Sequence, residues 1–229
     1  MVIFKNVLYQ IPNGEVIYHD LDVKIGDGEF YGVLGKNGAG KSTLIEIIMG
    51  LRKISSRKVV VFGENPESNY RTQKHRIFVV THDMMVPSNI TIGKLLDYYA
   101  FFYPNYDREI EKELLDLFEI NPKKKFGTLS TGQKIKALLC AAFAARCELY
   151  LMDEVTAVLD PKSRRNFFKY LKVFREKHQC SLLLATNIAE DLYQSVDHVI
   201  FIDSSHKVIV TEVEKLDSLF ELDDVESVA

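Results

Sequence analysis

The chain has 229 residues, of which 47% are hydrophobic and 27% are charged, and its formal net charge is −3. This length can bury a sizeable core in one large domain or two closely packed lobes, and the composition excludes a disordered or fibrous protein. The slightly acidic balance provides no broad basic surface, so we expect no nucleic-acid partner.

Two features of the sequence bear on its compartment. Residues 1–6 lack the charged start and long apolar centre of a signal peptide, and no run of 18 apolar residues occurs. The three cysteines, Cys140, Cys147 and Cys180, lack the spacing of a zinc site and are odd in number. We therefore expect a cytoplasmic protein with reduced, packed thiols.

The first part of the chain alternates short apolar runs with turn residues. The turns are marked by Pro12-Asn13-Gly14 and Gly26-Asp27-Gly28. The apolar runs occupy 2–4, 7–9, 16–18, 21–25 and 30–34. This pattern is typical of antiparallel strands, and we expect the last run to be a buried strand.

A glycine-rich loop connects the strand at 30–34 to an apolar helical stretch at 44–49. Its spacing fits the P-loop, in which the glycines let backbone N–H groups surround a phosphate at a helix N-terminus. Lys41 is expected to reach the β- and γ-phosphates of the ligand, and Ser42 to ligate Mg²⁺. The residues predicted to bind the ligand are Gly35, Asn37, Gly38, Ala39, Gly40, Lys41, Ser42 and Thr43.

The middle of the chain changes to helical periodicity. After strands at 59–62 and 77–80, helices are predicted at 92–103, 107–120 and 131–146. The first of these segments and the residues just after it carry more aromatic residues than one amphipathic face needs, which indicates core packing or, alternatively, a docking surface. These aromatic residues are Tyr98, Tyr99, Phe101, Phe102, Tyr103 and Tyr106.

Strands and helices alternate again in the last third, which predicts a mostly parallel, buried sheet. Strands are expected at 149–152, 181–186, 198–202 and 207–210. Helices are expected at 161–178 and 189–195, and the acidic tail at 219–229 should fray.

The strand at 149–152 ends in two carboxylates, Asp153 and Glu154. The carboxyl end of a parallel sheet is where ligands bind in such folds. Asp153 is suited to orienting Mg²⁺, and Glu154 to polarising a water that attacks the γ-phosphate. A plain turn is the alternative, but the upstream P-loop favours the catalytic interpretation.

The segment Leu129-Ser130-Thr131-Gly132-Gln133 lies between these motifs. With it the chain resembles the ATP-binding cassette (ABC) ATPases, whose signature is Leu-Ser-Gly-Gly-Gln. The P-loop, the signature, the acidic strand end and the Val158-Leu159-Asp160 loop follow in the family's order, so the resemblance covers nearly the whole chain. Thr131 departs from the family glycine.

The resemblance implies an α/β fold in a single nucleotide-binding domain, 1–229, that uses ATP and Mg²⁺. This fold has a P-loop NTPase core with a mostly parallel sheet, an N-terminal antiparallel β subdomain and an inserted α-helical subdomain. Residues 1–84 and 147–229 would form the core lobe, and residues 85–146 the helical lobe with the signature.

The resemblance also implies a second ABC ATPase subunit, because the family's signature contacts the γ-phosphate held by a partner. Ser130, Gly132 and Gln133 would then act in trans, and Asp160 would contact the partner's P-loop. Ser130 and Asp160 are equally well placed as helix N-caps. Tyr9 is the candidate for stacking on adenine, although it fits an ordinary strand position as well.

Two positions depart from the family pattern. His82 stands where the family has a glutamine that senses Mg²⁺ and the lytic water, and Asn187 stands where it has a histidine that contacts the γ-phosphate. The Asn187 amide can donate hydrogen bonds but carries no positive charge. Losing that charge would cost about 2 to 3 kcal/mol, so we expect slow hydrolysis or pairing with a more competent subunit.

The segment 102–125 is similar to the ATPases of bacterial ABC-2-type exporters. This similarity implies an ATP-hydrolysing subunit that dimerises head to tail at the cytoplasmic face of the membrane. It would drive an integral membrane permease that exports peptides, antibiotics or other amphipathic compounds. The alternatives are a soluble ABC ATPase outside transport and a slow or non-hydrolysing regulatory module.

Overall fold

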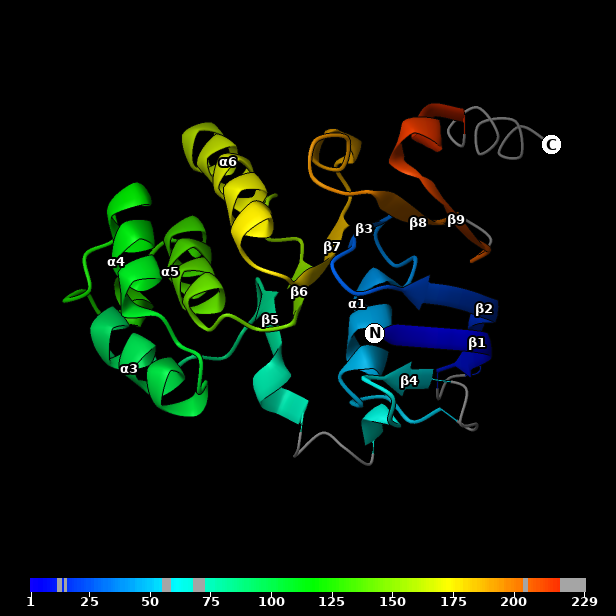
Figure 1. Ribbon diagram of the computed structural model, residues 1–229, viewed down its shortest axis with the longest axis horizontal. Coiled ribbons are helices and arrows are strands. Elements are labelled where there is room, and N and C mark those ends of the chain that lie inside the picture. Colours follow the sequence, from blue (N-terminus) through cyan, green and yellow to red (C-terminus); the bar gives the residue numbers. More distant parts are fainter. Residues whose placement is uncertain (12–13, 15, 55–58, 68–72, 204–205, 219–229) are drawn as a thin grey trace. The chain divides into compact units, whose positions relative to one another are not determined.

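The computed structural model describes residues 1–11, 14, 16–54, 59–67, 73–203 and 206–218 (Figure 1). The chain divides into two compact units. Unit 1 comprises Met1–Gln73 and Ser181–Ala229, and unit 2 comprises Lys74–Cys180. Among the described residues, no helix has the length and apolar character needed to cross a membrane. The predicted fraying tail and most of the Pro12-Asn13-Gly14 turn lie outside the described residues.

Unit 1 contains the antiparallel sheet that the N-terminal runs predict. The strands are β1 (Val2–Gln10), β2 (Val16–Ile25) and β4 (Val59–Val61), in the order β2-β1-β4. Inward-facing residues of β1 alternate with exposed ones until Asn6, whose positive φ of 48° interrupts the strand. The expected runs at 2–4 and 7–9 therefore form the single irregular strand β1, and the runs at 16–18 and 21–25 form its partner β2.

The other strands of unit 1 are mostly parallel. β3 (Phe30–Gly35) lies between β7 (Ser181–Thr186) and β8 (His198–Ile202), and all three run in the same direction. β9 (Val208–Glu212) pairs with β8 in the antiparallel direction. Because β3 and β7 are wholly buried, their residues form a nearly continuous apolar run. Helix α1 (Lys41–Ile48) follows β3 across the predicted P-loop.

The short helix expected over 189–195 is present but shorter than expected, and it is not an α-helix. The segment instead contains a short 3₁₀ helix, η3 (Ala189–Asp191), in which the Leu192 N–H bonds to the Ala189 carbonyl. Leu192 is fully buried, and a Cβ on Gly32 of β3 would lie 2.6 Å from its Cδ2. The packing of Leu192 against β3 ends the 3₁₀ helix after a single turn, so the helix does not extend to residue 195.

Unit 2 contains the parallel strands β5 (Ile77–Thr81) and β6 (Leu149–Asp153) together with four α-helices among its described residues. The α-helices are α3 (Ile92–Phe102), α4 (Arg108–Leu117), α5 (Thr131–Ala144) and α6 (Pro161–Lys177). The short 3₁₀ helices η1 (Lys74–Arg76) and η2 (Phe126–Thr128) precede β5 and α5, and η4 (Val213–Lys215) follows β9 in unit 1. The mostly parallel strands, the antiparallel β subdomain and the inserted helices confirm the predicted fold class.

Helix α5 forms the centre of unit 2. Ile135 and every residue of 137–144 are buried, so the helix is apolar all round for its last two turns. Figure 1 shows α3, α4 and α5 side by side, and the alanines of α5 let these neighbours approach closely. On another side, the Phe143 ring lies 4.9 Å from that of Phe174 on α6.

Candidate nucleotide-binding site

The glycines of the P-loop meet two physical requirements. Gly38 and Gly40 have φ angles of 87° and 110°, in the left-handed region that residues with a Cβ rarely adopt. Gly40 is also packed closely, since a Cβ there would lie 2.7 Å from Ile17 Cγ2 and 3.0 Å from Tyr18 Oη. At Gly35 a Cβ would lie 2.8 Å from the Ile202 carbonyl oxygen. The loop therefore has the tight backbone that its spacing predicts.

Lys41 is the first residue of α1, and only 4% of it is exposed. Its ammonium donates to the carbonyls of Gly35, at 2.8 Å, and Lys36, at 3.1 Å. Both of these acceptors are neutral, so they hold the ammonium at the loop without cancelling its charge. Ser42 follows as an exposed residue in the first turn of α1, where the helix dipole favours anions.

Two further residues support the loop, and the sequence analysis missed both. The Tyr18 hydroxyl, fully buried, donates to the Gly40 carbonyl at 2.6 Å, and burial raises its pKa. His206 Nδ1 lies 3.4 Å from the Ala39 carbonyl oxygen. Tyr18 lies in an apolar run of β2, which gives a signal for burial, whereas no sequence signal links His206 to a loop 167 residues away.

Tyr9 pairs with Tyr18 across the β1 and β2 strands. Its side chain points inward on β1, and only 6% of the residue is exposed. This placement fits the alternative role as a strand residue. Stacking of adenine on Tyr9 stays a prediction.

Asn187 comes directly after β7 and is exposed. Because Leu34 of β3 pairs with Thr186 of β7, the two parallel strands end at the same edge, and Asn187 and the P-loop both start there. The Ile188 N–H donates to Thr186 Oγ1 at 3.1 Å, which shapes the turn after Asn187. Unit 1 thus brings Asn187 to the edge that carries Gly35 and Lys41.

Unit 2 brings three other predicted residues to one edge. Thr81 of β5 pairs with Asp153 of β6, so His82 and Glu154 follow at the carboxyl ends of neighbouring parallel strands. Asp153 is 5% exposed, whereas His82 is exposed. Glu154 has a φ of 52°, and non-glycine residues in this region cluster at functional sites.

Ser130 and Asp160 are both helix N-caps, as the alternative interpretation of each predicts. Ser130 Oγ accepts from the Gln133 N–H at 3.3 Å, and the Gln133 side chain accepts from the Ser130 N–H at 3.2 Å. Asp160 caps α6 by accepting from the Ser163 N–H at 2.9 Å. Its hydrogen bonds to Ser163 lower its pKa to about 2. The trans roles of Ser130, Gly132, Gln133 and Asp160 stay predictions.

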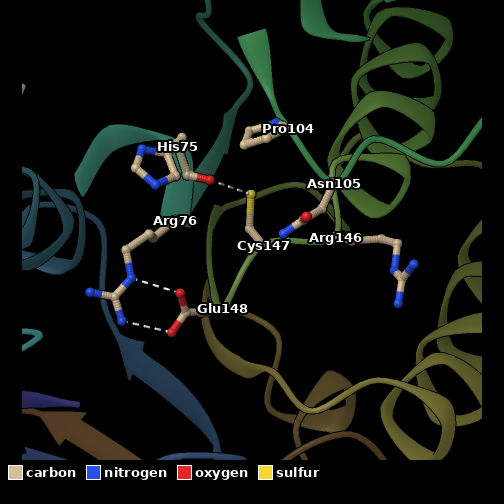
Figure 2. Close-up of a pocket in the computed structure, with 7 residues that line it drawn as sticks. All are labelled: His75, Arg76, Pro104, Asn105, Arg146, Cys147 and Glu148. Carbon is tan, nitrogen blue, oxygen red and sulfur yellow. Dashed lines mark hydrogen bonds and ion pairs between the residues drawn. The ribbon is translucent and has the colours of Figure 1, made fainter. Parts of the chain in front are cut away.

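A separate pocket of about 260 Å³ lies at the opposite, amino ends of β5 and β6. Figure 2 shows Arg76 and Glu148 joined by two hydrogen bonds, of 2.6 and 2.7 Å, on one side of it. Burial raises the pKa of the Cys147 thiol, whose sulfur lies 3.7 Å from the His75 carbonyl oxygen. None of the predicted site residues is among those that line it, which are His75, Arg76, Pro104, Asn105, Arg146, Cys147 and Glu148.

Residues 18–157 match the sequence profile of the family described as ABC transporter. The chain is 27% identical to the ABC transporter ATP-binding protein YtrB of Bacillus subtilis, over 89% of this chain and 70% of that protein. It is 28% identical to the Nod factor export ATP-binding protein I of Rhizobium leguminosarum, over 85% and 64%. It is 27% identical to the methionine import ATP-binding protein MetN of Clostridium acetobutylicum, over 96% and 70%. The chain thus spans roughly two thirds of the length of these relatives.

A solved structure described as the ATP-binding subunit of an ABC transporter is also similar. It superposes with a TM-score of 0.84, covering 97% of this chain and 94% of that one, at 22% sequence identity. At this identity the likeness establishes the fold.

Proposed function

This chain belongs to the ABC transporter family, and on that premise we propose that it is the ATP-binding and ATP-hydrolysing subunit of a membrane exporter. The P-loop carries the proposal. Gly38 and Gly40 take the left-handed backbone that lets N–H groups converge on a phosphate, and Lys41 adds a buried positive charge at the same place. This combination is typical of loops that bind polyphosphate ligands.

The residues present also suit Mg²⁺. Ser42 offers an exposed hydroxyl in the first turn of α1, and Asp153 offers a carboxylate at the end of β6. Oxygen ligands of this kind are those that Mg²⁺ prefers. When bound, the ion would neutralise charge on the β- and γ-phosphate oxygens of ATP.

Glu154 is our candidate general base for the water that attacks the γ-phosphate. Its left-handed backbone, directly after the buried β6, supports a specialised role. His82 directly follows β5 at the same edge of the sheet as Glu154, and it would contact the metal or the water. Asn187 would donate a neutral hydrogen bond to the γ-phosphate.

We further propose a head-to-tail dimer of two ABC ATPase subunits. As the cap of α5, the Ser130 hydroxyl oxygen accepts a hydrogen bond from the Gln133 N–H. The hydroxyl proton makes no hydrogen bond within the described residues, so the hydroxyl can donate to a partner's γ-phosphate. Gly132 and Gln133 lie in the same first turn of α5, whose dipole favours an anion. Asp160 would contact the partner's P-loop.

The membrane partner would be an integral permease at the cytoplasmic face of the membrane. Relatives include proteins named for export and for import, and we favour export because segment 102–125 is similar to exporter ATPases. Peptides, antibiotics or other amphipathic compounds are the expected cargo. A slowly hydrolysing or non-hydrolysing regulatory module is the second candidate, which His82 and Asn187 favour.

ATP binding and phosphate release, measured on three proteins, test this function. We expect Glu154→Gln to bind ATP as the wild type does but to lose roughly 100-fold or more in phosphate release, because it removes the general base. Lys41→Ala should lose ATP binding. Equal phosphate release by the wild type and Glu154→Gln would instead support the regulatory module, and ATP binding by neither would contradict both candidates.

A further inference from the structure

In unit 2, helix α5 and the loop at 156–160 are joined at two points one helical turn apart. Gly132 and Lys136 are four residues apart on α5 and therefore lie on the same face of the helix. At Gly132 a Cβ would lie 2.6 Å from the Val158 carbonyl oxygen. The Lys136 ammonium lies 3.6 Å from Asp160 Oδ2. The two contacts together determine both the distance and the register of the loop against the helix.

The Lys136 ammonium contacts both partners of the cap at the start of α6. It donates to Ser163 Oγ at 3.3 Å, and Ser163 Oγ in turn donates to Asp160 Oδ2 at 2.6 Å. The Asp160 carboxylate is therefore held from α6 by Ser163 and from α5 by Lys136. The Lys136 side chain is 14% exposed, while that of Asp160 is 53% exposed. The lysine is thus mostly withdrawn from water, and part of the carboxylate remains open to a partner.

We propose that Lys136 is a positioning residue, which fixes Asp160 relative to Ser130 so that the signature and the loop at 156–160 face a second subunit as one surface. The inference rests on the proposed head-to-tail dimer, in which Ser130 and Asp160 act in trans. It adds a residue that touches neither nucleotide nor metal. Lys136 acts through Asp160.

The positioning role of Lys136 can be distinguished from simple stabilisation of the fold. Helix α5 is held by its buried apolar residues, and the cap of α6 is completed by Ser163 without the lysine. Removing the ammonium should leave both helices folded. It should release the capped carboxylate and the loop from α5, so that they can take other positions relative to the signature, which lowers the fraction of molecules that are ready to close.

The test compares Lys136→Met with Lys136→Arg, and Lys169→Met serves as the matched control. Lys169 is an exposed lysine on α6, and its replacement removes the same charge. We expect Lys136→Met to lower kcat for ATP at least 10-fold and to weaken ATP-dependent dimerisation in a Glu154→Gln background. ATP affinity of the monomer should stay within twofold of wild type. Lys136→Arg should restore most of kcat, and Lys169→Met should match the wild type.

A double variant shows whether the lysine acts through Asp160. Lys136→Met combined with Asp160→Asn should be no slower than Asp160→Asn alone, because the lysine then has no carboxylate to position. Fold-changes that multiply, a wild-type kcat in Lys136→Met, or a failure of Lys136→Arg to restore kcat would each overturn the inference.

Amide hydrogen exchange tests the role of Lys136 without requiring that the protein dimerises or hydrolyses ATP. In the monomer without ATP, we expect the amides of 156–160 to exchange faster in Lys136→Met than in wild type. If the wild type neither dimerises nor hydrolyses ATP, the proposed function fails, and this measurement still shows whether Lys136 positions the loop at 156–160. Unchanged exchange of these amides would overturn it.

Discussion

Asn187 is exposed at the end of β7, next to the strand that leads into the P-loop. Its backbone position is set by the Thr186 side chain, which accepts from the Ile188 N–H. The side chain can therefore be exchanged without disturbing a buried contact. The chemistry available at this edge then depends on whether the side chain is a neutral amide or an imidazole that can carry charge.

Asn187→His should raise phosphate release, by up to about 100-fold, because a charge-assisted hydrogen bond to the transition state is stronger than a neutral one. ATP affinity should change little. The measurement is kcat at saturating ATP, with Asn187→Gln as a control that keeps the amide. A histidine variant as slow as wild type would show that the missing charge does not limit the rate.

At the scale of elements, Gly132 illustrates how a contact can outweigh helix propensity. It is the second residue of α5, where a Cβ would meet the Val158 carbonyl oxygen at 2.6 Å. Gly93 is the second residue of α3, and a Cβ there would lie 3.4 Å from the Pro122 carbonyl oxygen. The two glycines occupy the same helix position, and only the first is closed to a side chain.

We expect Gly132→Ala to destabilise the protein by about 1 to 3 kcal/mol, since the added methyl group overpacks the contact. Gly93→Ala should be neutral or stabilise it by up to about 1 kcal/mol, because alanine favours a helix over glycine. Urea unfolding of both variants measures the difference. Equal midpoints for the two variants would mean that the loop moves aside and that the contact with α5 is loose.

The sequence predicts those elements that have a local pattern. The P-loop, the strand before it and the acidic end of β6 each carry their signal within a few residues. Helix α5 was predicted because its alanines and leucines form a long run. The contacts of Gly132 with Val158 and of Lys136 with Asp160 could not be predicted, because they join residues more than 20 positions apart and depend on the packing of two helices.

At the scale of the whole molecule, unit 2 has an aromatic surface on α3, formed by Tyr98, Phe101 and Phe102, with Met85 also exposed. The predicted aromatic cluster divides between two roles. Tyr103 is buried and stacks on Phe78, whereas Phe101 is 92% exposed. Exposed aromatic side chains of this kind are enriched at protein interfaces.

Phe101→Ser should therefore weaken copurification with the proposed membrane subunit, because it removes a large apolar side chain from the aromatic surface. Phosphate release by the isolated protein should stay within twofold of wild type. Val173→Ser serves as a control, since Val173 is an exposed apolar residue on α6, away from the aromatic surface. Undiminished copurification of the Phe101 variant would show that the proposed membrane subunit does not bind at the aromatic surface.

The three buried cysteines have a practical consequence for following such assembly. Burial raises the pKa of the Cys140, Cys147 and Cys180 thiols, so at neutral pH they hold their protons and lie out of reach of solvent. A maleimide dye should react far more slowly with them than with a cysteine introduced on the surface. A single fluorophore can thus be attached to an introduced surface cysteine with little labelling of the native cysteines, and none of them needs to be removed first.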